Sequence, residues 1–95
     1  MIIKAKKVMF EIDEFKEVIR SGTYIVDFWV DDKDVHPNLE SVAKDLGFKK
    51  CYYIKVKSSV NKELCEKYKV TYVPTLIAFK GGREVSRIVG YKHER

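Results

Sequence analysis

Two thiols are the side chains of this chain that are best suited to covalent chemistry. The 95-residue sequence holds two cysteines, Cys51 and Cys65, and a thiolate can attack a disulfide or another electrophile. Cys51 follows Lys49 and Lys50, and adjacent cations favour the thiolate, so Cys51 is the better candidate for a reactive thiol. Cys65 follows Leu64 in a helical pattern that indicates a small buried thiol. Thiols without a chemical role are the simpler expectation, and a disulfide between them depends on a distance that the sequence does not specify.

A carboxylate in an apolar strand is the second group with chemical potential. Asp27 interrupts the run Tyr24–Val30, whose other side chains are apolar or aromatic. Desolvation makes a buried carboxylate costly unless it is paired or protonated. Lys55, in a later strand, is the natural partner of opposite charge. The pair is interpreted as structural, although a shifted carboxyl pKa would give Asp27 a role in proton transfer.

The remaining metal-binding side chains do not form a recognisable ligand set. His36 and His93 are the two histidines, and their spacing from the two cysteines matches no zinc pattern. We therefore expect neither a metal nor any other cofactor.

The charge balance favours a solvated surface. The net charge is +5, from 19 Lys and Arg against 14 Asp and Glu, which leans weakly toward acidic or phosphate-bearing partners. The segment from Lys49 to Lys57 alternates aromatic and cationic side chains, as in proteins that bind single-stranded nucleic acid. It also forms an interior strand of the expected sheet, so nucleic acid is not the expected partner.

Length and hydropathy predict one compact domain over residues 1–95. No apolar run approaches the ~20 residues of a membrane helix, and the N-terminal run is too short for a signal sequence. A cytoplasmic protein with reduced thiols is the expectation.

Hydrophobic spacing and turn residues predict the elements that must position these groups. Asp13 caps a helix that ends near Gly22. Gly47 closes a second helix that starts around Val35, and Pro37 either lies in its first turn or kinks it. Asn61 caps a third, short helix. The main strands are Tyr24–Val30 at the centre, Cys51–Lys57, and a hairpin of Leu76–Lys80 and Glu84–Val89 around Gly81 and Gly82.

The order strand, helix, strand, helix, strand, helix, strand, strand predicts an α/β fold with a mixed sheet flanked by helices. Tyr53, Lys55 and Lys57 share one face of their strand because side chains alternate along it.

Several landmarks in this order resemble the thioredoxin family. They are Val26-Asp27-Phe28-Trp29, Pro37, Lys55, Val73-Pro74-Thr75 and Gly90. The resemblance implies a thioredoxin-like fold, a cis peptide before Pro74, and a link to cell redox homeostasis. It also implies that Asp27 and Lys55 correspond to a pair that assists proton movement at active-site thiols. Trp29 and the Pro74 turn would border a groove for an extended substrate segment.

The chain departs from the family at the residues that carry the chemistry. Trp29 is followed closely by Asp31-Asp32-Lys33-Asp34, with no Cys-x-x-Cys, and the segment up to Pro37 is shorter than in the family. The entry to the second helix is thus expected to be shortened. The sequence ends at Arg95 where the family continues into a last helix, so one sheet face is expected to be under-covered.

These features favour a redox-inactive, non-catalytic module over an enzyme. It would bind a protein or peptide through Trp29, Asp31, Val73, Pro74, Thr75 and Gly90, or form a homodimer through the under-covered face. Asp27, Trp29, Lys55 and Pro74 would then be relics of the family's active site. The alternatives are thiol-disulfide exchange through Cys51 or Cys65 and an engineered or truncated thioredoxin variant.

Overall fold

A mixed β-sheet with helices on both faces makes up the computed structural model, which describes residues 2–4, 11–30 and 38–90. Its elements, in chain order, are β1 (Ile2–Lys4), α1 (Ile12–Ile19), β2 (Thr23–Trp29), α2 (Leu39–Asp45), β3 (Cys51–Lys57), the 3-10 turn η1 (Ser58–Val60), α3 (Lys62–Lys67), β4 (Thr75–Lys80) and β5 (Arg83–Val89). This element order confirms the order predicted from the sequence.

The sheet has the strand order β1-β3-β2-β4-β5. Strands β1, β3 and β2 run parallel, whereas β4 and β5 are antiparallel to their neighbours. The predicted central position of β2 is confirmed. Its side chains from Ile25 to Trp29 are buried on both faces, because helices cover each side of a strand in this position.

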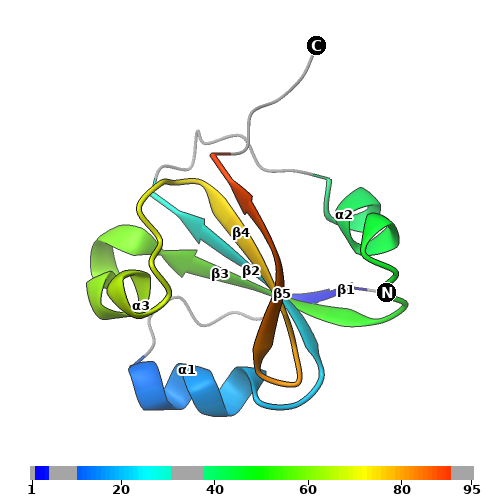
Figure 1. The fold of residues 1–95 in the computed structure, drawn as a ribbon, viewed down its shortest axis with the longest axis horizontal. Coiled ribbons are helices and arrows are strands. Elements are labelled where there is room, and N and C mark those ends of the chain that lie inside the picture. The colour runs from blue at the N-terminus through cyan, green and yellow to red at the C-terminus, as the bar shows by residue number, and fades with distance from the viewer. Residues whose placement is uncertain (1, 5–10, 31–37, 91–95) are drawn as a thin grey trace.

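Helices α1 and α3 cover one face of the sheet and α2 covers the other (Figure 1). Phe15 and Ile19 of α1 and Leu64 of α3 pack with the buried side chains of the first face. Ala43 of α2 packs against Tyr53 and other residues of the second face. The sheet is thus sandwiched between helices.

Helix α1 begins earlier than its sequence predicts. Glu11, and not Asp13, is the N-cap residue: its backbone is extended, and its N–H donates to Oε1 of Glu14 at 3.4 Å. Asp13 falls in the first turn, where a carboxylate complements the positive end of the helix dipole. Gly22 has φ +92°, which confirms the left-handed position predicted after the helix.

Helix α2 begins later than predicted, at Leu39. Asn38 is its N-cap, and Oδ1 of Asn38 accepts a hydrogen bond from the N–H of Ser41 at 3.2 Å. Gly47 has φ +76° and ends the helix as predicted. Val35 and Pro37, to which the sequence assigned the first turn, lie outside the described residues.

Asn61 lies at the predicted start of α3 but does not cap it through its side chain. Its Nδ2 donates instead to the carbonyl of Lys57 at 2.8 Å. The amide therefore ties the start of α3 back to the end of β3, across η1. The prediction was right about the position and wrong about the contact.

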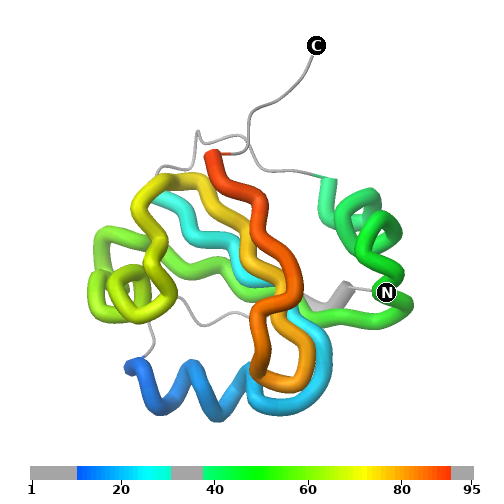
Figure 2. Tube along the Cα trace, viewed as in Figure 1, coloured from blue at the N-terminus to red at the C-terminus, as the bar shows by residue number. Residues whose placement is uncertain are grey.

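The hairpin of β4 and β5 confirms the predicted turn at Gly81 and Gly82. The N–H of Gly81 donates to the carbonyl of Gly22 at 2.9 Å. This bond joins the hairpin turn to the loop between α1 and β2, and the two lie side by side (Figure 2). Among the described residues, no helix is long and apolar enough to cross a membrane.

Candidate functional site

Four strands bring the candidate residues to one end of the sheet. The register places Trp29 beside Lys57, Phe28 beside Thr75, and Thr75 beside Val89. The ends of β2, β3 and β5 therefore meet the start of β4. We call this region the Trp29 edge and define it as Trp29, Lys55, Lys57, Tyr72, Val73, Pro74, Thr75 and Gly90.

The turn before β4 is held from two sides. The Val73–Pro74 peptide is cis, as the resemblance implied. The Oγ1 of buried Thr75 donates to the carbonyl of Tyr72 at 2.6 Å, and the N–H of Gly90 donates to the carbonyl of Pro74 at 2.9 Å. Gly90 has φ +63°, a conformation that favours glycine. These bonds present Tyr72 to solvent, with 66% of its surface exposed.

Trp29 is covered by two lysines. Only 8% of Trp29 is exposed, and the Nζ atoms of Lys55 and Lys57 lie 4.5 and 5.4 Å from the centre of its ring. Each contact is a cation–π interaction, typically worth about 0.5–1 kcal/mol at an exposed site. Within the described part of the chain, the buried Nε1 of Trp29 has no hydrogen-bond partner.

Asp27 is fully buried and accepts a hydrogen bond from a tyrosine. The hydroxyl of Tyr53 donates to Oδ2 of Asp27 at 2.6 Å. Burial, the hydrogen bond to Asp27 and the charge of Asp27, in that order, raise the pKa of Tyr53. Lys55 faces Asp27 in the strand register, yet its ammonium lies over Trp29. The predicted pairing of Asp27 with Lys55 is thus corrected to a hydrogen bond with Tyr53.

The two cysteines lie on opposite faces of the sheet and are free thiols. Cys51 is 1% exposed, and burial, ahead of the nearby charge of Glu40, raises the pKa of its thiol. The reactivity of Cys51 stays a prediction, and the burial of its thiol counts against it. Cys65 is half-buried and is the more accessible of the two.

Cys65 opens into a surface hollow next to the turn before β4. The hollow has a volume of about 320 Å³ and lies between α3 and this turn. Its lining residues are Ser58, Lys62, Cys65, Glu66, Val70, Thr71, Tyr72 and Val73. The hollow and the Trp29 edge thus share Tyr72 and Val73.

The sequence-predicted site is brought together in part. Trp29, Lys55, Val73, Pro74, Thr75 and Gly90 meet at the Trp29 edge, and Asp27 lies beneath them in β2. Thr75 is buried and supports the turn from inside. Asp31, His36 and His93 lie outside the described residues. No group of three or more His, Cys, Asp or Glu side chains suited to a metal exists among those that the structure describes.

Three residues of the site were missed as candidates. Tyr53 and Lys57 share a strand face with Lys55, so the alternation along β3 signalled that they accompany it. Tyr72 directly precedes the Val73–Pro74 pair, and this adjacency in the sequence was the signal for it.

Comparisons with known proteins agree with this geometry. The thioredoxin family model matches residues 6–95. Thioredoxin from Staphylococcus aureus, in strains Mu50 and MW2, is 35% identical over 83 residues, which cover 83% of this chain and 79% of the relative.

Solved structures show the same fold. A mutant thioredoxin from Halobacterium salinarum NRC-1 is 26% identical with a TM-score of 0.68, covering 97% of this chain and 80% of that one. Plasmodium falciparum thioredoxin is 25% identical with a TM-score of 0.65, covering 87% and 85%. A designed protein at 24% identity, with a TM-score of 0.71 and coverage of 93% and 83%, resembles this chain in fold. That likeness does not bear on the hypothesis of an engineered chain. With its mixed sheet, its cis-proline turn and these matches, the chain belongs to the thioredoxin family.

Proposed function

We propose that this thioredoxin-family protein is a non-catalytic module that binds an extended protein segment at the Trp29 edge. The observation that carries the proposal is the hydrogen-bonded turn at Tyr72 to Pro74, from which the Tyr72 side chain is exposed. Thr75 and Gly90 each hold one of its carbonyls, so the turn is preorganised. Preorganisation lowers the conformational entropy that is lost when a partner binds.

The positions of the thiols support binding over dithiol catalysis. A dithiol oxidoreductase needs a second thiol that can resolve the mixed disulfide. Cys51 and Cys65 lie on opposite faces of the sheet, and these are the two cysteines of the sequence. The fold thus keeps a turn for holding a segment but lacks a pair of thiols that could exchange electrons with it.

Two measurements test the proposal. The full chain should not accelerate insulin reduction by dithiothreitol, and it should retain peptides from a displayed library of random octapeptides. Y72S removes an exposed ring from the Trp29 edge and should reduce the number of retained octapeptides. V60S is the matched control, since Val60 is 49% exposed and lies outside the Trp29 edge. Rapid insulin reduction, or equal retention by Y72S and V60S, would contradict the proposal.

Thiol exchange through Cys65 is the second candidate function, and the hollow beside Val73 favours it. The Cys65 thiolate would attack one sulfur of a partner disulfide, break that bond and release the other sulfur as a thiolate. The product is a mixed disulfide that stays in place because no second thiol lies near. Oxidised glutathione is the probe: mass spectrometry should find one glutathione on the wild-type chain and none on C65S. A wild-type chain that stays unmodified rules out this candidate.

Self-association is a further proposal for the partner. Val85 and Val89 of the edge strand β5 are half exposed, and an exposed apolar edge can pair with another chain. Leu76 and Ala78, on the sheet face toward α2, are buried and offer no apolar surface to a second copy. Support for a homodimer therefore comes from the edge strand β5. Sedimentation that gives a monomer at high concentration would exclude it.

A further inference from the structure

We infer that the segment bound at the Trp29 edge carries an Asp or Glu side chain, whose carboxylate is held by Lys55 and Lys57. This inference rests on the proposed function and specifies the chemistry of the partner. It follows from three groups at one end of β2 and β3, each of which donates hydrogen bonds or carries positive charge.

Among the described residues, neither Lys55 nor Lys57 has an anionic partner. Across residues 2–4, 11–30 and 38–90, the described ion pairs join Arg20 to Glu17 and Arg87 to Glu84, and neither Lys55 nor Lys57 takes part in one. Both lysines are half-buried. Positive charge that is partly withdrawn from water and lies next to a low-dielectric wall attracts an anion more strongly than a fully solvated lysine does.

The indole of Trp29 adds a third donor. Its Nε1 is buried and has no acceptor within the described ranges, and an indole nitrogen can only donate. Trp29 is more than nine-tenths buried, so a missing partner costs free energy until an acceptor arrives. The ammonium groups also only donate. A ligand that satisfies all three groups must accept hydrogen bonds and carry negative charge.

The described contacts of the two cations are with Trp29 and not with the buried carboxylate of Asp27. Its Oδ2 accepts the hydrogen bond from Tyr53, whereas both ammonium groups lie over the ring of Trp29. Lys57 pairs with Trp29 in the register, and Phe28 next to it pairs with Thr75. A segment that runs along the turn at Val73 and Pro74 therefore passes within side-chain reach of the two cations.

A peptide carboxylate fits these contacts better than a nucleic-acid phosphate. Single-strand binders stack bases on exposed aromatic faces, but Trp29 is covered by the lysines, and Tyr52 of β3 stacks on Tyr24 at 5.0 Å between ring centroids. Strand β3 is interior, between β1 and β2. The face of β3 is thus closed to a nucleic-acid strand, and the accessible cationic groups lie at its end.

The test uses the full chain and the displayed library of random octapeptides. The octapeptides retained by the wild-type chain should be enriched in Asp and Glu, and the double variant K55Q/K57Q should lose this enrichment. K44Q/K67Q is the matched control, because it removes the same total charge from two exposed lysines that lie outside both the Trp29 edge and the hollow beside Cys65. One blocked Glu-containing octapeptide from the enriched pool and its Gln analogue are then titrated, with the single tryptophan, Trp29, as the fluorescent reporter.

The Glu octapeptide should bind about tenfold more tightly than the Gln analogue, as expected for hydrogen bonds to charged groups, and K57Q should remove most of this difference. Octapeptides retained without enrichment in acidic residues, or an enrichment that persists in K55Q/K57Q, would overturn the inference and leave the proposed function intact. If no octapeptide is retained, both the inference and the proposed function fail. An octamer of deoxythymidine that displaces the Glu octapeptide at equal concentration would overturn the inference. The ligand of the two lysines would then be a nucleic-acid phosphate.

The sequence places Asp31, Asp32 and Asp34 just after Trp29, and they lie outside the described residues. The triple variant D31N/D32N/D34N removes these three carboxylates and so measures their own effect on the binding of the Glu octapeptide. The inference expects this variant to bind the Glu octapeptide at least as tightly as the wild type. Weaker binding by the variant would overturn it, because the acidic run would then be part of the binding site.

Discussion

The hydroxyl of Tyr53 lies 2.6 Å from Oδ2 of Asp27, and both side chains are buried between adjacent strands. Asp27 and Tyr53 lie diagonally across β2 and β3, since Asp27 pairs with Lys55 and Ile25 pairs with Tyr53. The bond satisfies a carboxylate oxygen inside the sheet and leaves the ammonium of Lys55 available at the Trp29 edge. The hydrogen bond between Tyr53 and Asp27 thus stabilises the core, and the charge of Lys55 remains at the Trp29 edge.

Removing this hydroxyl should destabilise the fold. Y53F leaves the Asp27 carboxylate without its tyrosine donor, and losing a hydrogen bond to a buried charged group costs about 1.5–3 kcal/mol. Urea denaturation should show this decrease in the free energy of unfolding. Y52F is the control, since Tyr52 is half-buried and its ring contact with Tyr24 does not need the hydroxyl. Equal stabilities of Y53F and Y52F would show that the bond to Asp27 contributes nothing.

Alkaline pH should weaken the fold through the same tyrosine. Burial first, and then the bond to and charge of Asp27, raise the pKa of Tyr53. The contribution of the protonated Tyr53 hydroxyl to stability is thus fully present below the unfolded pKa of about 10 and is lost as the pH rises above it. The free energy of unfolding should fall by up to about 1.4 kcal/mol per pH unit for this group.

Urea denaturation between about pH 9 and pH 11, on both sides of the unfolded tyrosine pKa of about 10, measures this slope. Y53F should have a shallower slope than the wild type. Some slope should remain, because burial also raises the pKa of Tyr24 and of Tyr68. Identical slopes for Y53F and the wild type would refute the role assigned to Tyr53.

The two thiols should differ in reactivity. Cys51 is buried and burial raises the pKa of its thiol, whereas Cys65 is half-buried. A thiol reagent such as dithiobis-nitrobenzoate, at about pH 8, should label Cys65 at least about tenfold faster than Cys51 in the folded chain. The fast phase should vanish in C65S and persist in C51A. Denaturant should make both thiols react quickly, and a fast phase that survives in C65S would contradict the assignment.

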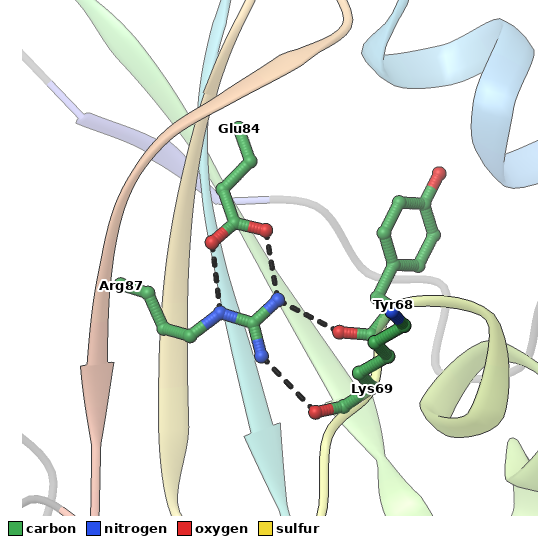
Figure 3. A network of polar contacts seen from close by, with 4 residues as sticks. All are labelled: Tyr68, Lys69, Glu84 and Arg87. Atoms are coloured by element: carbon green, nitrogen blue, oxygen red, sulfur yellow. Dashed lines mark hydrogen bonds and ion pairs between the residues drawn. The ribbon is translucent and has the colours of Figure 1, made fainter.

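Arg87 should be a stabilising residue that lysine cannot replace. Its guanidinium donates to both carboxylate oxygens of Glu84, to the carbonyl of Tyr68 at 2.7 Å and to that of Lys69 at 3.2 Å (Figure 3). These bonds attach the end of α3 to β5. A lysine has no planar fork, so R87K should lower the free energy of unfolding by about 1–2 kcal/mol.

Arg20 provides the comparison for this prediction. Its described ion pair joins it to Glu17 at 3.2 Å, and both side chains are more than 70% exposed. R20K should change the free energy of unfolding by no more than about 0.5 kcal/mol, as expected for a surface ion pair. Thermal or urea denaturation distinguishes the two variants. If R87K and R20K cost the same, the contacts of Arg87 with α3 do not contribute.

Much of the fold was predictable from local patterns. The run from Tyr24 to Val30 is apolar on both faces, which requires a strand covered on both sides, and β2 is the central strand. Gly22 and Gly47 marked helix ends because a left-handed backbone favours glycine. The helix starts were less accurate, since the capping contacts of Glu11 and Asn38 depend on side-chain geometry.

The candidate site was predictable in its members and not in its contacts. Residue types and order pointed to the thioredoxin family, to the absence of the dithiol, and to Trp29, Lys55 and Pro74 as one site, because these follow from the chain alone. Only the tertiary structure decided that Asp27 binds Tyr53, that Lys55 lies over Trp29, and that Cys51 is buried while Cys65 is accessible. Strand register and helix packing bring together side chains that are distant in sequence, and the burial they impose determines which charge or thiol meets a partner.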